Sequence, residues 1–447
     1  MSIPQGLKGR YAYHFTLIDN LESIIDRGLL CTNLKNARGV SHENIAEQGI
    51  QGRRSTMPVP CSGGKFVHDY VPFYFSKKTS MQLSVINKKN VDQPLLLYFA
   101  IPIEILEQRA GVVFSDASAN TDAPPKFYNL SSANMLDYLN WVAIDDKKWG
   151  CPTDEYRHQK MAELLIPDSV DISEVSYIVV WNKWIKEKVE KIFLAKGIQP
   201  PKIRFDADHY YINFYEGGQK SIITGPRFLR NQVEQTITEI CRSTCGNKKY
   251  ESIRASLGAI ALNFSSIKEL DDIDGLRASY GPHTDDVGTH SRKVAAGLSQ
   301  LHEYNELSEK DKEIVLLSAY LHDIGKGPKS RWGQDGMTRA DNDHAVKSLP
   351  MLKRILTEDI GGLSEESIRK IVILVAYDDL IGDIVARERD EKQLADVIEN
   401  ENDLNMLIAL AKADMNSINM FWVISHWQSI EALKRRMLQV LGCNSPC

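Results

Sequence analysis

The sequence predicts two domains of different fold class, an α+β domain at residues 1–215 and an all-α helical bundle at residues 256–447. The chain has 447 residues, which exceeds the size of one ordinary hydrophobic core. Short runs rich in β-branched and aromatic residues dominate the first half. Long runs with apolar residues at helical spacing fill the second half. The turn-rich segment 216–255 is expected to connect the two domains.

The first half is expected to be rich in strands. The strand-like runs are YAYHFTL, DYVPFYFS, PLLLYFAIP, AELLIP and VSYIVVWN. Between the first two, Leu21, Ile24 and Ile25 follow helical spacing, and Gly28 is expected to end that helix. Because strands and helices do not alternate regularly, an α+β fold fits better than a doubly wound parallel sheet.

The second half is expected to be helical throughout. Its helical runs are DVGTHSRKVAAGLSQLHEY, EKDKEIVLLSAYLHDIGK, HAVKSLPMLKRIL, SEESIRKIVILVAYDDLI, DLNMLIALAKADMNSI and FWVISHWQSIEALKRRMLQVL. We find no internal repeat and no coiled-coil heptad in the sequence.

The composition excludes some partners. The net charge of −5 provides no overall positive field, so binding to nucleic acid requires a local basic groove. No apolar run has the length of a membrane span, and the first residues lack the apolar core of a signal peptide. We therefore expect a cytoplasmic protein with no membrane partner.

Histidine and aspartate occur on the buried faces of the predicted helices. His290 shares a helix face with Val287, Val294 and Leu298, and the pair His322–Asp323 closes the apolar run IVLLSAYL. Asp414 lies on an equally apolar face, where an aspartate without a partner is costly. Each residue alone has an ordinary explanation, such as a hydrogen-bonded core histidine or a helix cap. Together they favour one divalent metal ion at the bundle centre.

This order of residues around LHDIGKG resembles the HD-domain phosphohydrolases over roughly residues 280–420. The resemblance implies a divalent ion (Mn, Mg, Fe or Zn) that activates water for attack on a phosphate ester, and a nucleotide is the candidate substrate. The implied ligands are His290, His322, Asp323 and Asp414. Lys326 is implied as a phosphate contact, and His344 as a second-metal ligand or substrate contact.

One departure from the HD pattern affects the number of metal ions. Relatives with two metals usually carry a further histidine near AYDDLIGD, where this chain has Tyr377, Asp378 and Asp379. We therefore expect a one-metal site, or a weakly active one.

Polar and aromatic residues of the first half suggest a nucleotide site. His14 and Thr16 share one strand face, where they either bind a ligand or meet solvent. The adjacent Arg53 and Arg54 lie in water or, within a cleft, clamp phosphates. The run HDYVPFYF, with Tyr74, either stacks a nicotinamide or base or forms an aromatic core.

Glu163 is the local exception in the apolar run AELLI. Such exceptions concentrate at functional sites. A carboxylate at this position can stabilise an oxocarbenium-like centre while a glycosidic bond opens. NAD⁺ is a suitable donor because its nicotinamide leaves the ribose as a neutral group.

With YHFTLIDN, IQGRR, HDYVPFYF and RHQKMAELLI in this order, about residues 11–213 resemble the DarT family of NAD-dependent ADP-ribosyltransferases, which modify bases in DNA. The resemblance implies Arg54 as the catalytic arginine and Glu163 as the catalytic glutamate. It implies NAD⁺ as co-substrate, with contacts listed as His14, Phe15, Thr16, Ser23, Arg53 and Tyr74. Single-stranded DNA is the expected partner, because an enclosed site cannot reach a base stacked in a duplex.

Basic residues just before Glu163 are candidates for binding the nucleic acid. Arg157, His158 and Lys160 either hold phosphates beside the site or belong to a solvated charged segment.

The chain is therefore expected to join an α+β ADP-ribosyltransferase-like domain to an all-α HD-domain bundle. Its expected role is that of a toxin or anti-phage defence effector, with an HD domain that restrains it, reverses the modification or hydrolyses a phosphorylated nucleotide. Three alternatives stay open. The chain is chiefly a metal-dependent nucleotide phosphohydrolase with an N-terminal nucleotide- or nucleic-acid-binding module, or it modifies RNA, or it hydrolyses NAD⁺ without transfer.

Overall fold

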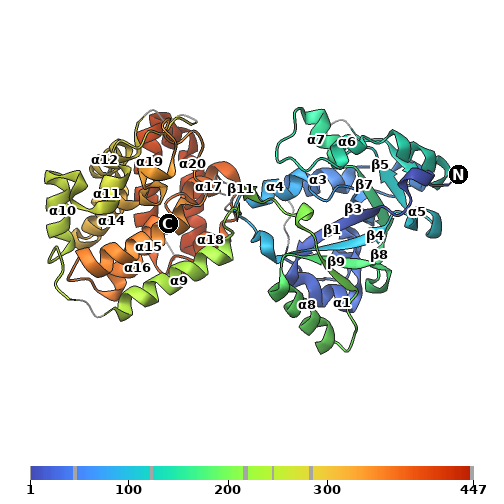
Figure 1. The fold of residues 1–447 in the computed structure, drawn as a ribbon, viewed down its shortest axis with the longest axis horizontal. Helices are drawn as coiled ribbons and strands as arrows, with labels where there is room; N and C mark the ends of the chain where they lie inside the picture. Colours follow the sequence, from blue (N-terminus) through green and yellow to red (C-terminus); the bar gives the residue numbers. More distant parts are fainter. Residues whose placement is uncertain are drawn as a thin grey trace. The chain divides into compact units, whose positions relative to one another are not determined.

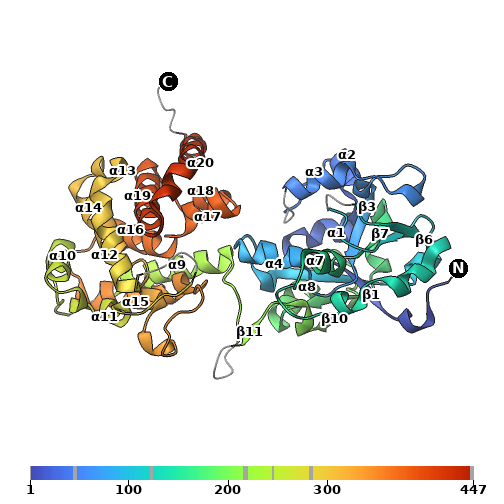
Figure 2. The same ribbon diagram turned by 90° about the horizontal axis from the view of Figure 1, so that it is seen from above.

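The structure is a computed structural model that describes residues 2–43, 48–120, 124–214, 220–243, 246–280 and 285–442. The chain divides into two compact units, one of Met1–Asn87 and Val91–Ile222 and one of Lys88–Asn90 and Ile223–Cys447. Each unit has a hydrophobic core of its own. Strands dominate the first unit and helices form the second (Figures 1 and 2), which confirms the predicted fold classes.

The first unit is built on an eight-stranded sheet with the order β10-β9-β4-β1-β3-β7-β5-β6. The bounds are β1 Tyr11–Leu17, β3 Tyr70–Tyr74, β4 Leu96–Pro102, β5 Val113–Ser115, β6 Phe127–Asn129, β7 Glu163–Pro167, β9 Tyr177–Val180 and β10 Lys202–Phe205. Neighbouring strands are antiparallel, except that β9 and β10 are parallel. The five predicted strand runs become β1, β3, β4, β7 and β9. The central position of β1 and β3 brings residues far apart in the sequence onto neighbouring strands.

Two short ribbons and several helices complete this unit. The ribbons pair β2 Leu29–Leu30 with β8 Ser169–Val170, and β11 Asn213–Phe214 with β12 Lys220–Ser221. The helices are α1 Leu21–Arg27, α2 Thr32–Ala37, α3 Gln48–Thr56, α4 Ser80–Asn87, α5 Ile105–Gln108, α6 Trp141–Ile144, α7 Asp154–Lys160 and α8 Lys183–Ala195. Helix α1 ends at Gly28 as predicted. Gly28 has φ 77°, and a Cβ there would lie 2.6 Å from the Val170 carbonyl oxygen.

The second unit is a bundle of helices (Figure 2). Their bounds are α9 Pro226–Arg242, α10 Ile253–Leu262, α11 Lys268–Ile273, α12 Val287–Gly297, α13 His302–Asn305, α14 Glu309–Leu321, α15 His344–Arg354, α16 Glu365–Ala376, α17 Leu380–Arg387, α18 Lys392–Ala395, α19 Glu401–Ile418 and α20 Met420–Val440. Among the described residues, each helix is too short or too polar to cross a bilayer.

The structure differs from the sequence prediction at several places in the bundle, among them a break at Leu301 (φ −96°, ψ 134°) within the helical run 286–304. The run predicted as one helix from 364 to 381 is interrupted at Tyr377, which has non-helical dihedral angles (φ −124°, ψ 25°). The predicted connector 216–255 contains α9, whose apolar face, with Leu229, Val233 and Ile240, is buried in the core of the second unit. Helical spacing alone does not reveal either of the last two features, because both depend on what the helix packs against.

Candidate functional sites

Arg54 and Glu163 form a buried ion pair in the first unit. The guanidinium of Arg54, on α3, donates from Nη1 to Glu163 Oε1 at 2.8 Å and from Nη2 to Oε2 at 2.9 Å. Glu163, at the start of β7, is fully buried and also accepts a hydrogen bond from the Ala119 backbone N–H at 3.1 Å. A buried bidentate pair is specific in geometry, and loss of either partner leaves an uncompensated charge.

Arg54 of this pair lines a cavity of about 360 Å³. Of the residues singled out from the sequence, His14, Phe15, Thr16, Arg54 and Tyr74 line it. The strand register explains this grouping, because Tyr74 of β3 lies opposite both Tyr13 of β1 and Glu163 of β7. The rings of Phe15 and Tyr74 are nearly parallel, at 6.1 Å between centroids. The cavity therefore combines aromatic surfaces with one buried cation, which suits a nucleotide.

A second cavity, of about 470 Å³, adjoins the first. The two share Ile50, Met81 and Asn120, and Asn120 follows the residue whose N–H binds Glu163. Arg157 and His158, near the end of α7, line this second cavity. Arg54 of the ion pair thus lines a hollow rich in aromatic residues, and a hollow with basic residues adjoins it.

Four residues converge at the centre of the second unit. His290 of α12, His322 and Asp323 after α14, and Asp414 of α19 are all buried. His290 Nε2 lies 2.9 Å from Asp414 Oδ1 and 3.6 Å from Asp323 Oδ2, and His322 Nε2 lies 3.5 Å from the same Asp323 oxygen. Ligands around an ion with bonds of about 2.1 Å are separated by roughly 3 to 4 Å. The predicted set is therefore assembled at spacings that fit one ion.

The orientation of the two imidazoles supports a cation between them. His322 Nδ1 donates to the Ala319 carbonyl oxygen at 2.8 Å, and His290 Nδ1 donates to Ser417 Oγ at 2.9 Å. The Nε2 atoms of both rings therefore point to the same position, 3.2 Å apart, where His290 Nε2 also lies 2.9 Å from Asp414 Oδ1. Ring nitrogens and a carboxylate oxygen that converge in this way are arranged like the ligands of one ion. Fixing the tautomer through Nδ1 is also typical of histidine ligands.

Lys326 and His344 border this centre. Lys326 Nζ donates to Asp323 Oδ2 at 2.7 Å. Burial raises the pKa of Asp323, but Lys326 and the surrounding histidines outweigh it and hold that pKa well below its usual range. Helix α15, which begins at His344, packs closely on the turn after Asp323, since a Cβ at Gly325 would lie 2.0 Å from the His344 carbonyl oxygen. Only glycine permits this approach, which places His344 beside Asp323.

Matches with known proteins follow the two units. The family described as "ssDNA thymidine ADP-ribosyltransferase, DarT" matches residues 13–212. A DNA ADP-ribosyl transferase of Thermus aquaticus is 31% identical over 205 residues, which are 44% of this chain and 88% of that protein. The chain belongs to the DarT family. Residues 287–414 match the HD domain, so both resemblances seen in the sequence are confirmed.

Further relatives cover the DarT unit only. A DNA ADP-ribosyl transferase of Escherichia coli is 26% identical over 191 residues, 40% of this chain and 84% of that protein. Among solved structures, Thermus sp. 2.9 DarT in complex with ADP-ribosylated ssDNA matches with 28% identity and a TM-score of 0.41, over 47% of this chain and 99% of that one. The same DarT in complex with NAD⁺ matches with 26% identity and a TM-score of 0.40, over 47% of this chain and 100% of that one.

Three residues singled out in the DarT unit lie elsewhere than expected. Successive helix positions are about 100° apart, so Arg53 points away from Arg54, lines the second cavity and donates to the Asn120 carbonyl oxygen at 2.9 Å. Ser23, on α1, is not among the described residues that line the first cavity. Lys160 is buried, and its Nζ donates to the carbonyl oxygens of Asp146 at 2.7 Å and Lys148 at 3.2 Å. Lys160 therefore secures a loop and is withdrawn from any nucleic acid.

Sequence reasoning also missed residues of the first cavity. His68 lines it, and its buried Nε2 has no hydrogen-bond partner among the described residues. Lys35 and His42 line it too, with 3.1 Å between Lys35 Nζ and His42 Nε2. His68 opens the quoted run HDYVPFYF and was within reach of the sequence argument. Lys35 and His42 carry no local signal, because only the fold brings them to the cavity.

His14 gives the DarT unit a pH dependence that can be measured. Burial lowers the pKa of His14 to about 4, although its bond to the Pro72 carbonyl oxygen (2.8 Å) opposes the shift. Between the ordinary value and pH 4 the unfolded chain binds a proton that the folded protein does not, so stability is lost as the pH falls through this window. We expect the melting temperature to fall less steeply from pH 6.5 to pH 4 in His14→Gln than in the wild type, by calorimetry. The exposed-site variant His302→Gln serves as control and should parallel the wild type. Parallel curves for His14→Gln would contradict the assignment.

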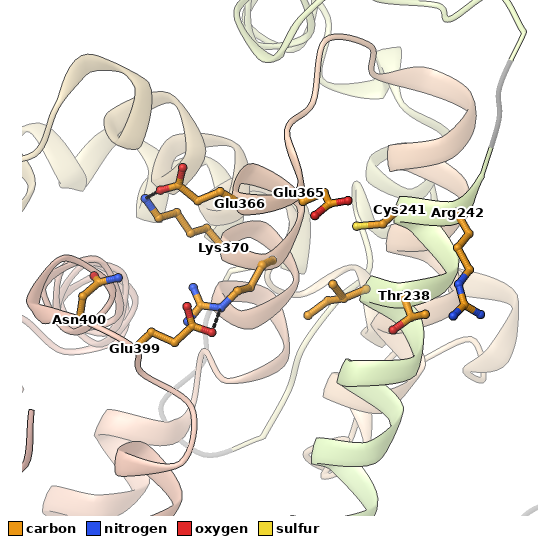
Figure 3. Close-up of a pocket in the computed structure, with 10 residues that line it drawn as sticks. Thr238, Cys241, Arg242, Glu365, Glu366, Lys370, Glu399 and Asn400 are labelled. Carbon is orange, nitrogen blue, oxygen red and sulfur yellow. Dashed lines mark ion pairs between the residues drawn. The ribbon is translucent and has the colours of Figure 1, made fainter.

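A larger cavity, of about 510 Å³, lies between α9, α16 and the residues before α19 (Figure 3). Four of its charged side chains form two ion pairs. Lys370 Nζ lies 2.6 Å from Glu366 Oε1, and Arg369 Nε lies 2.9 Å from Glu399 Oε1. These pairs leave the cavity without an evident demand for a ligand, and we assign it no site.

Proposed function

We propose that this chain transfers ADP-ribose from NAD⁺ to a base in single-stranded DNA and acts as a toxin or anti-phage defence effector. The observation that carries the proposal is the buried Arg54–Glu163 pair, whose arginine lines the first of two adjoining cavities. The DarT relatives are described as DNA ADP-ribosyl transferases, and the matching family is described as acting on thymidine. Thymine is therefore the first base to test.

The first cavity is proposed to bind NAD⁺. When bound, NAD⁺ supplies an ADP-ribosyl group whose bond to nicotinamide breaks while positive charge develops on the ribose. Glu163 holds its negative charge in a water-poor position, where a carboxylate stabilises a nearby positive charge most strongly. Phe15 and Tyr74 offer ring surfaces for stacking, and Lys35 offers a cation for the phosphates.

Arg54 is proposed to link the donor to the acceptor. Its guanidinium lines the first cavity and is oriented by both oxygens of Glu163. In this geometry the arginine covers the carboxylate, so Glu163 acts on the reacting atoms through Arg54 or after Arg54 swings aside. We propose that Arg54 positions the base that enters from the second cavity.

The second cavity is proposed to hold the DNA strand. Arg53, Arg157 and His158 line it, and two of them are cations at neutral pH. Basic side chains of this kind bind phosphates and fix the register of a strand without reading its sequence. A strand with unstacked bases fits this arrangement better than a duplex, because the target base must reach the buried pair.

We propose that the second unit, about residues 256–447, is a metal-dependent phosphohydrolase. His290, His322, Asp323 and Asp414 would hold a divalent ion, and the close approach of their nitrogen and oxygen atoms supports that assignment. When bound, the ion activates water for attack on a phosphate ester. Lys326, next to Asp323, is placed to meet a phosphate oxygen of a nucleotide.

Transfer of label from NAD⁺ to an oligonucleotide tests the main proposal. We expect the full chain, incubated with NAD⁺ labelled in its adenylate part, to attach the label to a thymine-containing single strand and not to the matching duplex. Mass spectrometry of the product should show the added mass of one ADP-ribose. Label on RNA alone would favour an RNA-directed enzyme, and free ADP-ribose with unlabelled strands would favour NAD⁺ hydrolysis. Absence of any NAD⁺ consumption would overturn the proposal.

A further inference from the structure

We propose that the second unit binds two divalent ions, the second held by His344, Asp378 and Asp379 and joined to the first by Asp323. The sequence predicted one ion, because Asp378 and Asp379 stand near the position where HD-domain relatives with two metals usually carry a histidine. The inference rests on the metal centre proposed above for the HD unit and is independent of the transferase. It begins from the geometry of Asp323.

The two carboxylate oxygens of Asp323 face different groups. Oδ2 lies 3.5 Å from His322 Nε2 and 3.6 Å from His290 Nε2. Oδ1 lies on the other side, 4.0 Å from His344 Nε2. A carboxylate with one oxygen toward each of two ligand groups is placed to bridge two ions. Two-metal hydrolytic sites have ions about 3.5–4 Å apart, a separation that a single carboxylate spans.

Asp378 supplies an independent sign of a missing ligand. The residue is only 5% exposed, and its Oδ1 has no hydrogen-bond partner among the residues that the structure describes. A buried carboxylate oxygen without a partner is unfavourable, so such atoms call for an explanation. Ligand atoms of Asp378, His344 and Asp379 all lie within 4.8 Å of one another, so the three side chains are close enough to converge on one ion.

His344 is oriented as a ligand. Its Nδ1 lies 2.8 Å from the Asp341 carbonyl oxygen and donates to it, which directs Nε2 toward Asp378 Oδ2 at 3.2 Å and Asp379 Oδ2 at 3.9 Å. A doubly protonated His344 would satisfy Asp378 Oδ2 but would leave Oδ1 without a partner. A divalent ion would be a common partner for His344, both aspartates and Oδ1 of Asp323.

The interruption after α16 produces this arrangement. Helix α16 ends before Tyr377, and Asp378 and Asp379 precede α17, so both carboxylates lie in the break. A small cavity of about 60 Å³ is lined by Asp378, Asp379 and Asp414, so carboxylates of both ligand groups border it. The second position is rich in carboxylate oxygens, and such ligands suit Mn²⁺ or Mg²⁺. Two such ions together would bind a phosphate group of the substrate.

Metal counting on the full chain tests the proposal. We expect the metal-stripped protein, dialysed against excess Mn²⁺, to hold two Mn²⁺ per chain by elemental analysis and to show a spin-coupled Mn²⁺ signal in electron paramagnetic resonance. Asp378→Asn and His344→Gln should each hold one Mn²⁺, with the signal of an isolated ion. Asp379 also lies 3.4 Å from Lys89 Nζ of the same unit, so the variants are made at the other two ligands.

The control is Asp335→Asn, the same chemical change at an exposed position of the same unit, which should hold two Mn²⁺. One Mn²⁺ in the wild type would overturn the second site and leave the single-metal centre standing. No Mn²⁺ in the wild type would refute the metal centre altogether. Two ions retained in both variants would overturn the proposal, since Asp378 and His344 would then not be ligands. No ion retained in either variant would also overturn it, since the two ions would then not occupy separate sites. A variant is folded if its far-ultraviolet circular dichroism spectrum matches that of the wild type and if it retains one Mn²⁺ per chain.

Discussion

Glu163→Gln is expected to lower ADP-ribose transfer to single-stranded DNA by about 10²- to 10³-fold, the loss typical of removing one electrostatic group from a transition state. The wild-type carboxylate offers two acceptor oxygens to the two donors of Arg54, at 2.8 and 2.9 Å. Glutamine has one oxygen and one NH₂ group, so one donor of Arg54 would face another donor. Both the negative charge and the orientation of Arg54 are lost.

The same substitution is expected to destabilise the protein. Arg54 is buried, and breaking a buried ion pair by removing one partner costs about 3–5 kcal/mol. Calorimetry should therefore show a lower melting temperature for Glu163→Gln, and the transfer assay is run well below it. In cells, expression of this variant should no longer arrest growth.

The control is Glu187→Gln, the same change at a half-exposed glutamate of α8, which should keep both transfer and stability. Arg54→Lys adds a second comparison, because it keeps the positive charge and removes the two-pronged contact. It should also lose transfer. A Glu163→Gln enzyme that is folded and keeps more than a tenth of the wild-type rate would refute the role of Glu163.

Asp323→Ala is expected to abolish tight Mn²⁺ binding in the second unit while leaving transfer unchanged. Asp323 lies beside both ligand groups. Loss of a residue that only hydrogen-bonds to a metal ligand already weakens metal binding about 10- to 100-fold. A loss greater than 100-fold is therefore expected in a dialysis titration. Removal of the charge also leaves Lys326 buried without its partner, so the melting transition of this unit should move down.

The effect on growth separates the roles of the two units. If the HD unit restrains the transferase or removes its product, growth arrest by Asp323→Ala is unchanged or stronger. Asp335→Ala, at an exposed position, should match the wild type in metal binding, transfer and growth. Loss of growth arrest in Asp323→Ala, with transfer intact in vitro, would make the HD unit a second effector.

Several site residues could be predicted from the sequence because each violates a local pattern. Glu163 interrupts an apolar strand, and His290 and Asp414 interrupt apolar helix faces, so burial follows from the neighbours. Lys160 shows the limit of such reasoning. It lies beside Arg157 in a basic run, but a lysine that binds backbone carbonyls inside the protein has the same local sequence as one that binds phosphate.

By itself the sequence determined the fold class of each half and the strand runs of the DarT unit. It also indicated the chemistry of the two candidate centres, one in each unit. Strand and helix periodicity, and the cost of burying a charge, are local properties that each segment carries with it. Only the tertiary structure decided that Arg54 and not Arg53 meets Glu163, and that the two oxygens of Asp323 face different ligand groups. It also placed Asp378 in a break between two helices. These outcomes depend on strand register, helix rotation and close packing at Gly325. Such features arise from contacts between segments, so the local sequence of one segment does not reveal them.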